Sequence, residues 1–326
     1  MELIANLRTR YKNVAGVILR PAAEFRHLFD GGNPFILVVH KIEKLRIERI
    51  LKFLSARYRF VTSGQFVASL EEGEYNTRYC LLTADDGYEA QIRDLTEVAG
   101  SLDIPALFFV STEMAGTGGY FWWDRLAAII DAAAAAGAPL RVGDRLYSTA
   151  TPAARFKTRL AITRSQYDRP SKEISSFLAR VAADNIGAGR EHELSMPAGT
   201  RVADWKLIKE TAASSLFKFG SHAVTHPFIS LLDDVELERE LSESQQTIAR
   251  EVGEKPGWFC YPYGRVKTTA SAARIIGRYY NAAVTGDRGR VRPRTPRLRL
   301  PRIGLEINDT PSIALAKIQG TWLSLG

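Results

Sequence analysis

Short apolar runs alternate with segments of helical periodicity along most of this chain of 326 residues, and this alternation restricts its fold more than any other feature. The expected strands are residues 35–39, 59–62, 78–83 and 106–110, and the expected helices are residues 46–58 and 91–102. Repeated strand–helix units predict an α/β fold with a parallel sheet, because parallel strands need long crossovers that are usually helical. The pattern alone leaves open whether the sheet closes into a barrel.

Two adjacent carboxylates, Asp85 and Asp86, follow the apolar run at residues 79–84 and precede Gly87. Side chains alternate in direction along a strand, so neighbouring carboxylates at its end face different ways. One of them can therefore bind a metal while the other handles a proton. In isolation the same tripeptide would also suit a simple turn after a strand.

Two histidines, His222 and His226, follow a short apolar segment at residues 217–219 and come directly before Pro227. An H-x-x-x-H pair alone is more often two unrelated histidines. The chain has only five histidines, however, and this pair lies just past an expected strand end. If the segment coils into a helical turn, both imidazoles can converge on one ion, and zinc accepts such a mixed set of nitrogen and oxygen ligands.

Four sequence blocks occur in the order and spacing of a known family. They are residues 83–88 (TADDGY), 105–110 (PALFFV), 220–227 (GSHAVTHP) and 259–264 (FCYPYG). Together they resemble the polysaccharide deacetylases, the NodB-homology family of carbohydrate esterases. The resemblance extends over about residues 35–115 and 200–305 and implies a distorted (β/α) barrel of seven strands.

The resemblance also implies roles for four side chains. Asp85 would be the catalytic base, and Asp86, His222 and His226 would bind one divalent metal ion, with zinc the expected metal. Three protein ligands leave a position for water and for the amide carbonyl, and the ion lowers the pKa of water from 15.7 toward about 7. Asp85 would then take the proton of the attacking water.

Three departures from the family pattern concern the base, the acid and the packing. Cys260 stands where the third block usually has an arginine, and Arg302 is either its replacement or a surface arginine. Residues 300–307 lack the late histidine that serves many members as general acid. We therefore expect His40, at the end of the first strand, to protonate the leaving group, although a histidine there can equally be structural. Ala84 replaces an aromatic residue without removing a functional group.

We expect an N-terminal extension at residues 1–34 and a deacetylase barrel domain at residues 35–326, interrupted by a largely helical insertion at about residues 116–201. The stretch between the motifs is too long for a structureless loop. Its residues Trp122 and Trp123 either form a wall on which a sugar stacks or anchor the insertion to the barrel. The candidate substrate-binding residues are Tyr88, Tyr261, Tyr263, Trp122 and Trp123.

Positive charge is concentrated late in the chain, which has 44 basic and 36 acidic residues. Seven arginines lie between residues 288 and 302, interleaved with three prolines. Such a run is usually a solvated loop, but it could also attract a lipid-diphosphate headgroup or an anionic membrane surface, where each basic residue contributes about 1 kcal/mol. No base-reading motif accompanies it, so we expect no nucleic-acid partner.

The expected substrate is an N-acetylated amino sugar in a glycan or in a lipid- or nucleotide-linked precursor. The apolar stretches are too short or too charged for a signal peptide or a membrane span. The expected location is therefore cytoplasmic, with association at the inner face of the membrane as a further option. Two alternatives stay open, namely removal of a formyl or O-acetyl group by the same fold, and a carbohydrate-binding protein with a decayed catalytic centre.

Overall fold

Seven parallel strands form a closed barrel in the computed structural model, which describes residues 33–264 and 270–321. β1 pairs with β10 on one side and with β3 on the other, which closes the ring. In barrel order the strands are β1 (Phe35–Val39), β3 (Tyr79–Ala84), β4 (Ala106–Val110), β7 (Phe217–Ser221), β8 (Trp258–Cys260), β9 (Ala282–Arg288) and β10 (Leu300–Leu305). The expected seven-stranded (β/α) barrel is confirmed. The expected extension at residues 1–34 lies almost wholly outside the described residues.

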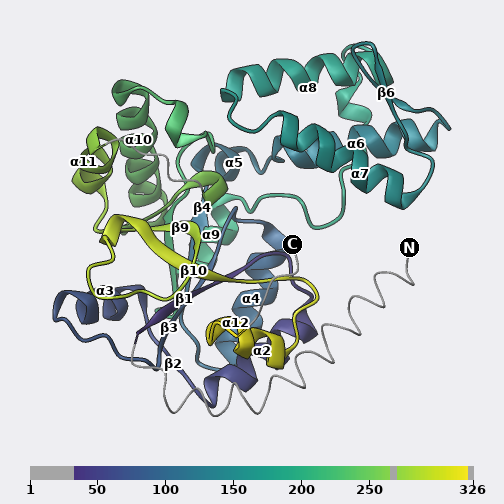
Figure 1. Ribbon diagram of the computed structural model, residues 1–326. Coiled ribbons are helices and arrows are strands. Elements are labelled where there is room, and N and C mark those ends of the chain that lie inside the picture. The colour runs from purple at the N-terminus through teal and green to yellow at the C-terminus, as the bar shows by residue number, and fades with distance from the viewer. Residues whose placement is uncertain (1–32, 265–269, 322–326) are drawn as a thin grey trace.

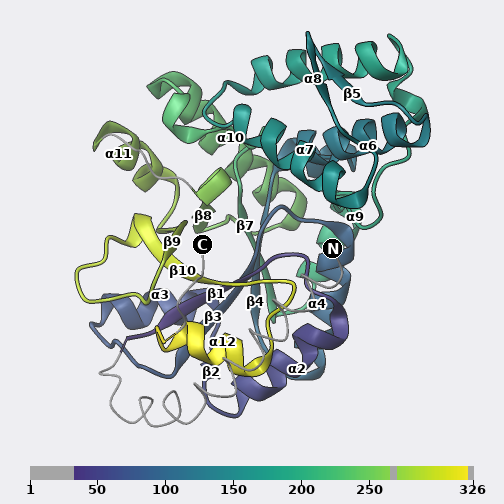
Figure 2. The same cartoon turned by 45° about the vertical axis from the view of Figure 1, so that its right-hand side comes forward.

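Helices surround the barrel on two sides (Figures 1 and 2). One side is covered by α2 (Lys44–Ser55), α4 (Glu89–Ser101) and α12 (Pro311–Ile318), and the opposite side by α10 (Asp234–Val252) and α11 (Ala270–Tyr279). Three further helices are α3 (Ser63–Glu71), α5 (Thr112–Thr117) and α9 (Trp205–Ala212).

One expected strand is much shorter than its apolar run. The strand expected at residues 59–62 is reduced to β2 (Arg59–Phe60), which pairs with the beginning of β3 outside the ring. Its length is limited because Thr62 caps α3 by accepting a hydrogen bond from the backbone N–H of Gln65.

Apolar side chains of the strands point alternately to the inside of the barrel and to the helices. Ile36, Leu81 and Leu107 belong to one buried cluster, whereas Phe35 and Leu37 belong to another that includes residues of α2 and α4. Strands buried on both faces have continuous apolar sequences, so the chain shows runs rather than alternation at β1, β3 and β4.

The segment between β4 and β7 contains a separate lobe beside one end of the barrel (Figures 1 and 2). The lobe consists of α6 (Trp122–Ala135), a hairpin of β5 (Leu140–Val142) and β6 (Arg145–Tyr147), α7 (Pro152–Ser165) and α8 (Ser171–Ile186). It has its own apolar core, which includes Leu126, Ile162 and Leu178. The expected helices are present, and the short hairpin is an addition that three-residue strands do not reveal in sequence.

Within the described residues, none of the helices combines the length and the apolar composition that crossing a bilayer requires. α6, which holds the most apolar stretch of the lobe, is a 14-residue helix with Asp124 and Asp131 in it.

Two glycines bring the loop after β8 into backbone contact with β9. A Cβ on Gly264 would lie 2.7 Å from Gly286 Cα, and Gly264 has a φ of 66°. Neither position has room for a side chain, because Gly286 faces Gly264 in turn at 3.1 Å. This contact fixes the loop that carries Tyr263 beside the open end of the barrel.

Replacing Gly264 with alanine should reduce the free energy of unfolding by about 1–3 kcal/mol more than replacing Gly137, because the added methyl group meets backbone that cannot move aside. Gly137 is a matched control, since its φ is 68° and its added Cβ would meet no atom within 4 Å. Urea unfolding of Gly264→Ala and Gly137→Ala measures the difference. Equal losses would show that the Gly264–Gly286 contact is not restrictive.

Candidate metal centre

The two carboxylates at the end of β3 diverge at a sharp turn. Asp86 and Gly87 both have left-handed backbone conformations, with φ values of 69° and 70°. A Cβ on Gly87 would come within 2.9 Å of Val110 Cγ1, so glycine is needed there for space as well as for conformation. As a result, Asp85 bonds a residue of β10 while Asp86 faces the end of β7.

Asp85 forms a buried, two-pronged ion pair with Arg302 of β10. Arg302 Nη1 and Nη2 each donate to one carboxylate oxygen at 2.7 Å, and Nε donates to the carbonyl of Thr285 at 3.0 Å. Arg302 is 4% exposed, so the alternative of a surface arginine is wrong. Burial raises the pKa of Asp85, but the charge and hydrogen bonds of Arg302 outweigh burial and bring that pKa below its ordinary value.

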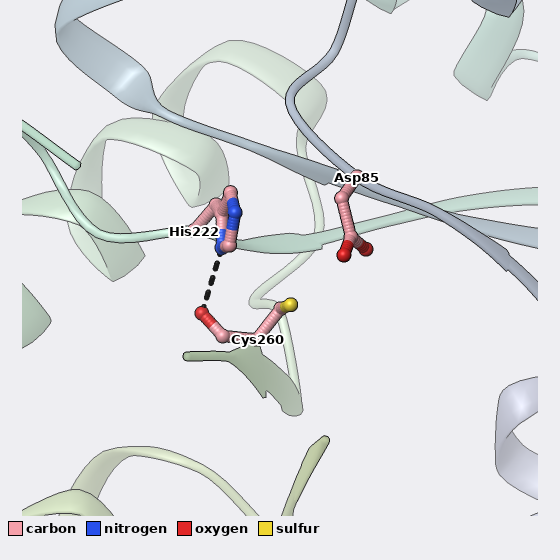
Figure 3. Close-up of side chains that lie close together, drawn as sticks. All are labelled: Asp85, His222 and Cys260. Atoms are coloured by element: carbon pink, nitrogen blue, oxygen red, sulfur yellow. Dashed lines mark hydrogen bonds between the residues drawn. The ribbon is translucent and has the colours of Figure 1, made fainter. Parts of the chain in front are cut away.

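Asp86 faces both histidines. Its Oδ1 lies 3.5 Å from His222 Nε2 and 3.5 Å from His226 Nε2, and one ligand atom from each residue lies within 4.8 Å of the others. Nδ1 of His222 donates to the carbonyl of Cys260 at 2.8 Å, as the dashed line in Figure 3 shows. This bond places the proton on Nδ1 and leaves the lone pair of Nε2 directed at Asp86, which is the arrangement of a metal-binding histidine.

The electrostatics of Asp86 and His222 favour a cation beside them. Burial raises the pKa of Asp86, but the two imidazoles outweigh burial and bring it well below its ordinary value. Burial lowers the pKa of His222, but Cys260 and Asp86 outweigh burial and raise it. The site therefore attracts positive charge, and a divalent ion would compete with a proton for His222 Nε2.

The histidines converge through an irregular loop, so the expectation of a helical turn is wrong. Ala223 and His226 have left-handed φ values of 65° and 58°, which cost about 1–2 kcal/mol per residue in non-glycine residues. The loop is held by Glu240 of α10, which accepts from the backbone N–H of Val224 at 2.8 Å and of Thr225 at 3.0 Å.

The structural role of Glu240 was not predicted, although the sequence contains a signal for it. It is 2% exposed and shares the buried face of α10 with Leu237 and Leu241. A carboxylate on the apolar face of an amphipathic helix must find hydrogen-bond donors, and here these are the backbone of the histidine loop.

Aromatic rings surround the second histidine. The ring centroid of His226 lies 4.6 Å from that of Tyr263, 5.1 Å from that of Phe121 and 5.2 Å from that of Trp123. Phe121 and Trp123 belong to the start of the inserted lobe. The insertion thus packs directly on a candidate metal ligand.

A second group of possible ligands, Asp85, His222 and Cys260, also lies close together (Figure 3). Arg302 donates to both oxygens of Asp85. The His222 nitrogen nearest Cys260 is Nδ1, which donates its proton to the Cys260 carbonyl and so has no lone pair for a metal. Burial raises the pKa of the Cys260 thiol, whereas a metal ligand must be a thiolate. A cation there would also meet the Arg302 guanidinium, so the residues that fit a metal are Asp86, His222 and His226.

These residues open into a cavity of about 390 Å³ at the end of the barrel. His40, which is exposed, lines this cavity together with Asp85 and Arg302. The insertion forms one wall with Trp122 and Trp123 of α6, Thr163 of α7, and Tyr167 just after α7. Trp122 also donates from Nε1 to the hydroxyl of Tyr263 at 3.0 Å, so these tryptophans both line the cavity and attach the lobe to the barrel.

Two of the tyrosines expected to bind substrate are buried instead. Tyr88 is 2% exposed, and its hydroxyl donates to Asp124 at 2.7 Å and accepts from Trp123 at 2.8 Å. It therefore connects the β3 turn to the insertion and is not placed to bind substrate, which corrects that expectation. Tyr261 lines the cavity, but it is 1% exposed and its hydroxyl donates to the carbonyl of Leu298.

Replacing Arg302 with leucine should lower the free energy of unfolding at pH 7 by about 3–5 kcal/mol, because it leaves the buried Asp85 charge without a partner. The double variant Arg302→Leu/Asp85→Asn, which removes both charges, should recover part of this loss. Because folding lowers the pKa of Asp85, the contribution of the pair is present at neutral pH and is lost as pH falls through that lowered pKa. Urea unfolding checks all three points, and a loss under about 1 kcal/mol in the single variant would contradict the pairing.

Known proteins share this architecture. A family model described as polysaccharide deacetylase matches residues 177–280, whereas a search of curated proteins found no match. Among solved structures, the Streptococcus pyogenes deacetylase PplD is 14% identical, with a TM-score of 0.57 over 88% of this chain and 98% of that one. IcaB from Ammonifex degensii is 18% identical, with a TM-score of 0.56 over 89% and 98%. The BpsB deacetylase domain from Bordetella bronchiseptica is 15% identical, with a TM-score of 0.52 over 85% and 97%.

At these identities the likeness to solved structures establishes the fold. The family model in addition matches the sequence itself, over a segment that contains His222, His226 and Cys260. Together they confirm the resemblance drawn from the motifs, and this chain is similar to the NodB-homology polysaccharide deacetylases.

Proposed function

We propose that this protein is a metal-dependent hydrolase that removes the N-acetyl group from an amino sugar. The relationship to polysaccharide deacetylases supports hydrolysis of acyl groups on carbohydrates in general. Metal-dependent removal of an N-acetyl group is supported by one observation. Asp86, His222 and His226 converge beside Asp85, which is paired with Arg302, and all four line the same cavity.

Asp86, His222 and His226 would hold one divalent ion, and zinc suits their two nitrogens and one oxygen. When bound, such an ion polarises the acyl carbonyl and brings the pKa of water close to neutrality. The tautomer of His222 is already set for this role by its bond to the carbonyl of Cys260.

Asp85 would take the proton from the attacking water. The bidentate pair with Arg302 keeps this carboxylate ionised at neutral pH and fixes its direction. The same pairing weakens Asp85 as a base, so it needs a water whose acidity has been raised. In this proposal the base and the metal site therefore depend on each other.

The departing amine needs a proton, and we assign its donor as His40. It stands directly after β1, is exposed and lines the cavity with Asp85 and Arg302. The histidine that other family members have late in the chain is absent from β10.

The cavity suits a sugar ring. Trp122, Trp123 and Tyr263 line it, and aromatic faces cover the apolar faces of sugars well. Its volume of about 390 Å³ is in the range of small-ligand pockets. The cytoplasmic location expected from the sequence stays a prediction.

Asparagine substitutions should separate the roles of the two neighbouring carboxylates. Asp85→Asn should keep bound metal and lose activity, whereas Asp86→Asn should lose both, as should His222→Ala and His226→Ala, because only Asp86 and the histidines contact the ion. His192→Ala, which changes an exposed histidine of the insertion, is the control and should keep both. Metal analysis after dialysis and acetate release measure the two effects, and equal metal loss in Asp85→Asn and Asp86→Asn would refute the division of roles.

Loss of the proposed acid should depend on the leaving group. His40→Ala should lower turnover of an N-acetylated sugar by about 10²- to 10⁴-fold with metal content unchanged, since general acid catalysis contributes about this much. The loss should be much smaller for an activated aryl acetate, whose leaving group departs without a proton. Equal losses on both substrates would instead indicate a structural His40.

A further inference from the structure

A second cavity, of about 330 Å³, adjoins the catalytic one. It lies between residues 289–292 after β9, the strand β10, and the end of α12. Arg288 and Gly304 line both cavities, so the two are neighbours. The connection between β9 and β10 contains no α-helix, only the 3-10 helix η4 (Arg297–Arg299), and the arginine run of the sequence lies in this connection.

The lining of the second cavity is basic. It includes Arg288, Arg290, Arg292 and Lys317, with Glu306 and Asp309 as the acidic partners nearby. Lys317 Nζ binds Asp309 at 2.6 Å, and Arg288 lies 3.8 Å from Glu306 while remaining 68% exposed. Among the described residues no carboxylate pairs with the exposed Arg292. Within the described part of the chain, Arg288, Arg292 and Lys317 face the two carboxylates Glu306 and Asp309, which leaves a positive excess.

The end of α12 would by itself disfavour an anion, because backbone carbonyls face outward there. Arg290 Nε donates a hydrogen bond to the carbonyl of Ile318 at 3.0 Å. Arg290 Nη1 also donates to the carbonyl of Asn33 at 2.6 Å. Arg290 therefore neutralises the helix end and fixes the wall of the cavity.

Gln319 supplies an independent indication of a ligand. Its side chain is 7% exposed and lines the cavity, yet within residues 33–264 and 270–321 neither Nε2 nor Oε1 has a hydrogen-bond partner. Buried amides nearly always have partners, because leaving them unbonded is unfavourable. A rotation of this side chain would direct Nε2 into the cavity, where an oxyanion would accept from it.

We propose that this second cavity binds a phosphate or diphosphate group. Several guanidinium groups and an amide donor around a small cavity match the many acceptor oxygens of phosphate better than the two of a carboxylate. If the group belongs to the substrate, the shared residues Arg288 and Gly304 place its sugar toward the metal centre, and this part rests on the proposed function. Anion binding itself does not depend on it.

The binding test uses full-length protein treated with a chelator, so that phosphate cannot bind through a metal. Calorimetric titration with pyrophosphate and with inorganic phosphate should detect one site, and Arg292→Glu or Gln319→Leu should raise its Kd at least about tenfold, which corresponds to about 1.4 kcal/mol. Arg294→Glu is the matched control, because it makes the same charge change two residues away from Arg292 at a position that does not line the cavity. Absence of binding to the wild type, or equal effects of Arg292→Glu and Arg294→Glu, would overturn the proposal.

A kinetic comparison then identifies the source of the phosphate. With metal restored, Arg292→Glu should raise KM for a diphosphate-linked N-acetylated amino sugar by about tenfold with kcat unchanged, and leave KM for a neutral N-acetylated oligosaccharide unaltered. If pyrophosphate binding is lost but both KM values stay the same, the cavity binds free phosphate. Failure to hydrolyse either substrate would count against the proposed function alone, since the titration measures anion binding, which does not require catalysis.

Discussion

The buried pair between Asp85 and Arg302 is the contact on which the catalytic end of the barrel depends. It joins the end of β3 to β10, the two strands that flank β1 where the barrel closes. Cys260 Sγ lies 3.4 Å from Arg302 Nη2, so the small thiol leaves space for a guanidinium that comes from β10. We therefore infer that Arg302 takes the place of the arginine that the family resemblance implies for the third motif. This replacement argues against a decayed catalytic centre.

The remaining parts of the centre are held by residues outside the family motifs and by Tyr88 of the first motif. Glu240 bonds the backbone of the strained histidine loop, and Phe121 and Trp123 pack against His226. Tyr88 and Asp124 connect the turn after β3 to the first helix of the insertion. The insertion is thus both a wall of the cavity and a support of the candidate metal site. Changes in the lobe are expected to act on catalysis as well as on substrate binding.

The sequence predicts those features that depend on local pattern. The strand and helix alternation and the position of the Asp85–Asp86 pair both follow from neighbouring residues. Features that depend on barrel closure could not be predicted, because no local signal says which residue of β10 stands opposite Asp85. For the same reason the buried position of Tyr88 was missed, since its partner Asp124 is 36 residues away. The helical turn for the histidines failed because i, i+4 spacing also fits a loop with two left-handed residues.

X-ray absorption at the zinc edge of the zinc-loaded protein tests the central assignment most directly, because it distinguishes the two possible ligand groups. The Asp86, His222 and His226 group predicts only nitrogen and oxygen neighbours at about 2.0–2.2 Å, including two imidazoles. The group in Figure 3 would add the sulfur of Cys260 at about 2.3 Å. A spectrum with two imidazoles and no sulfur would support the account. A sulfur neighbour would contradict it, because Asp85 would then be a ligand and not the base.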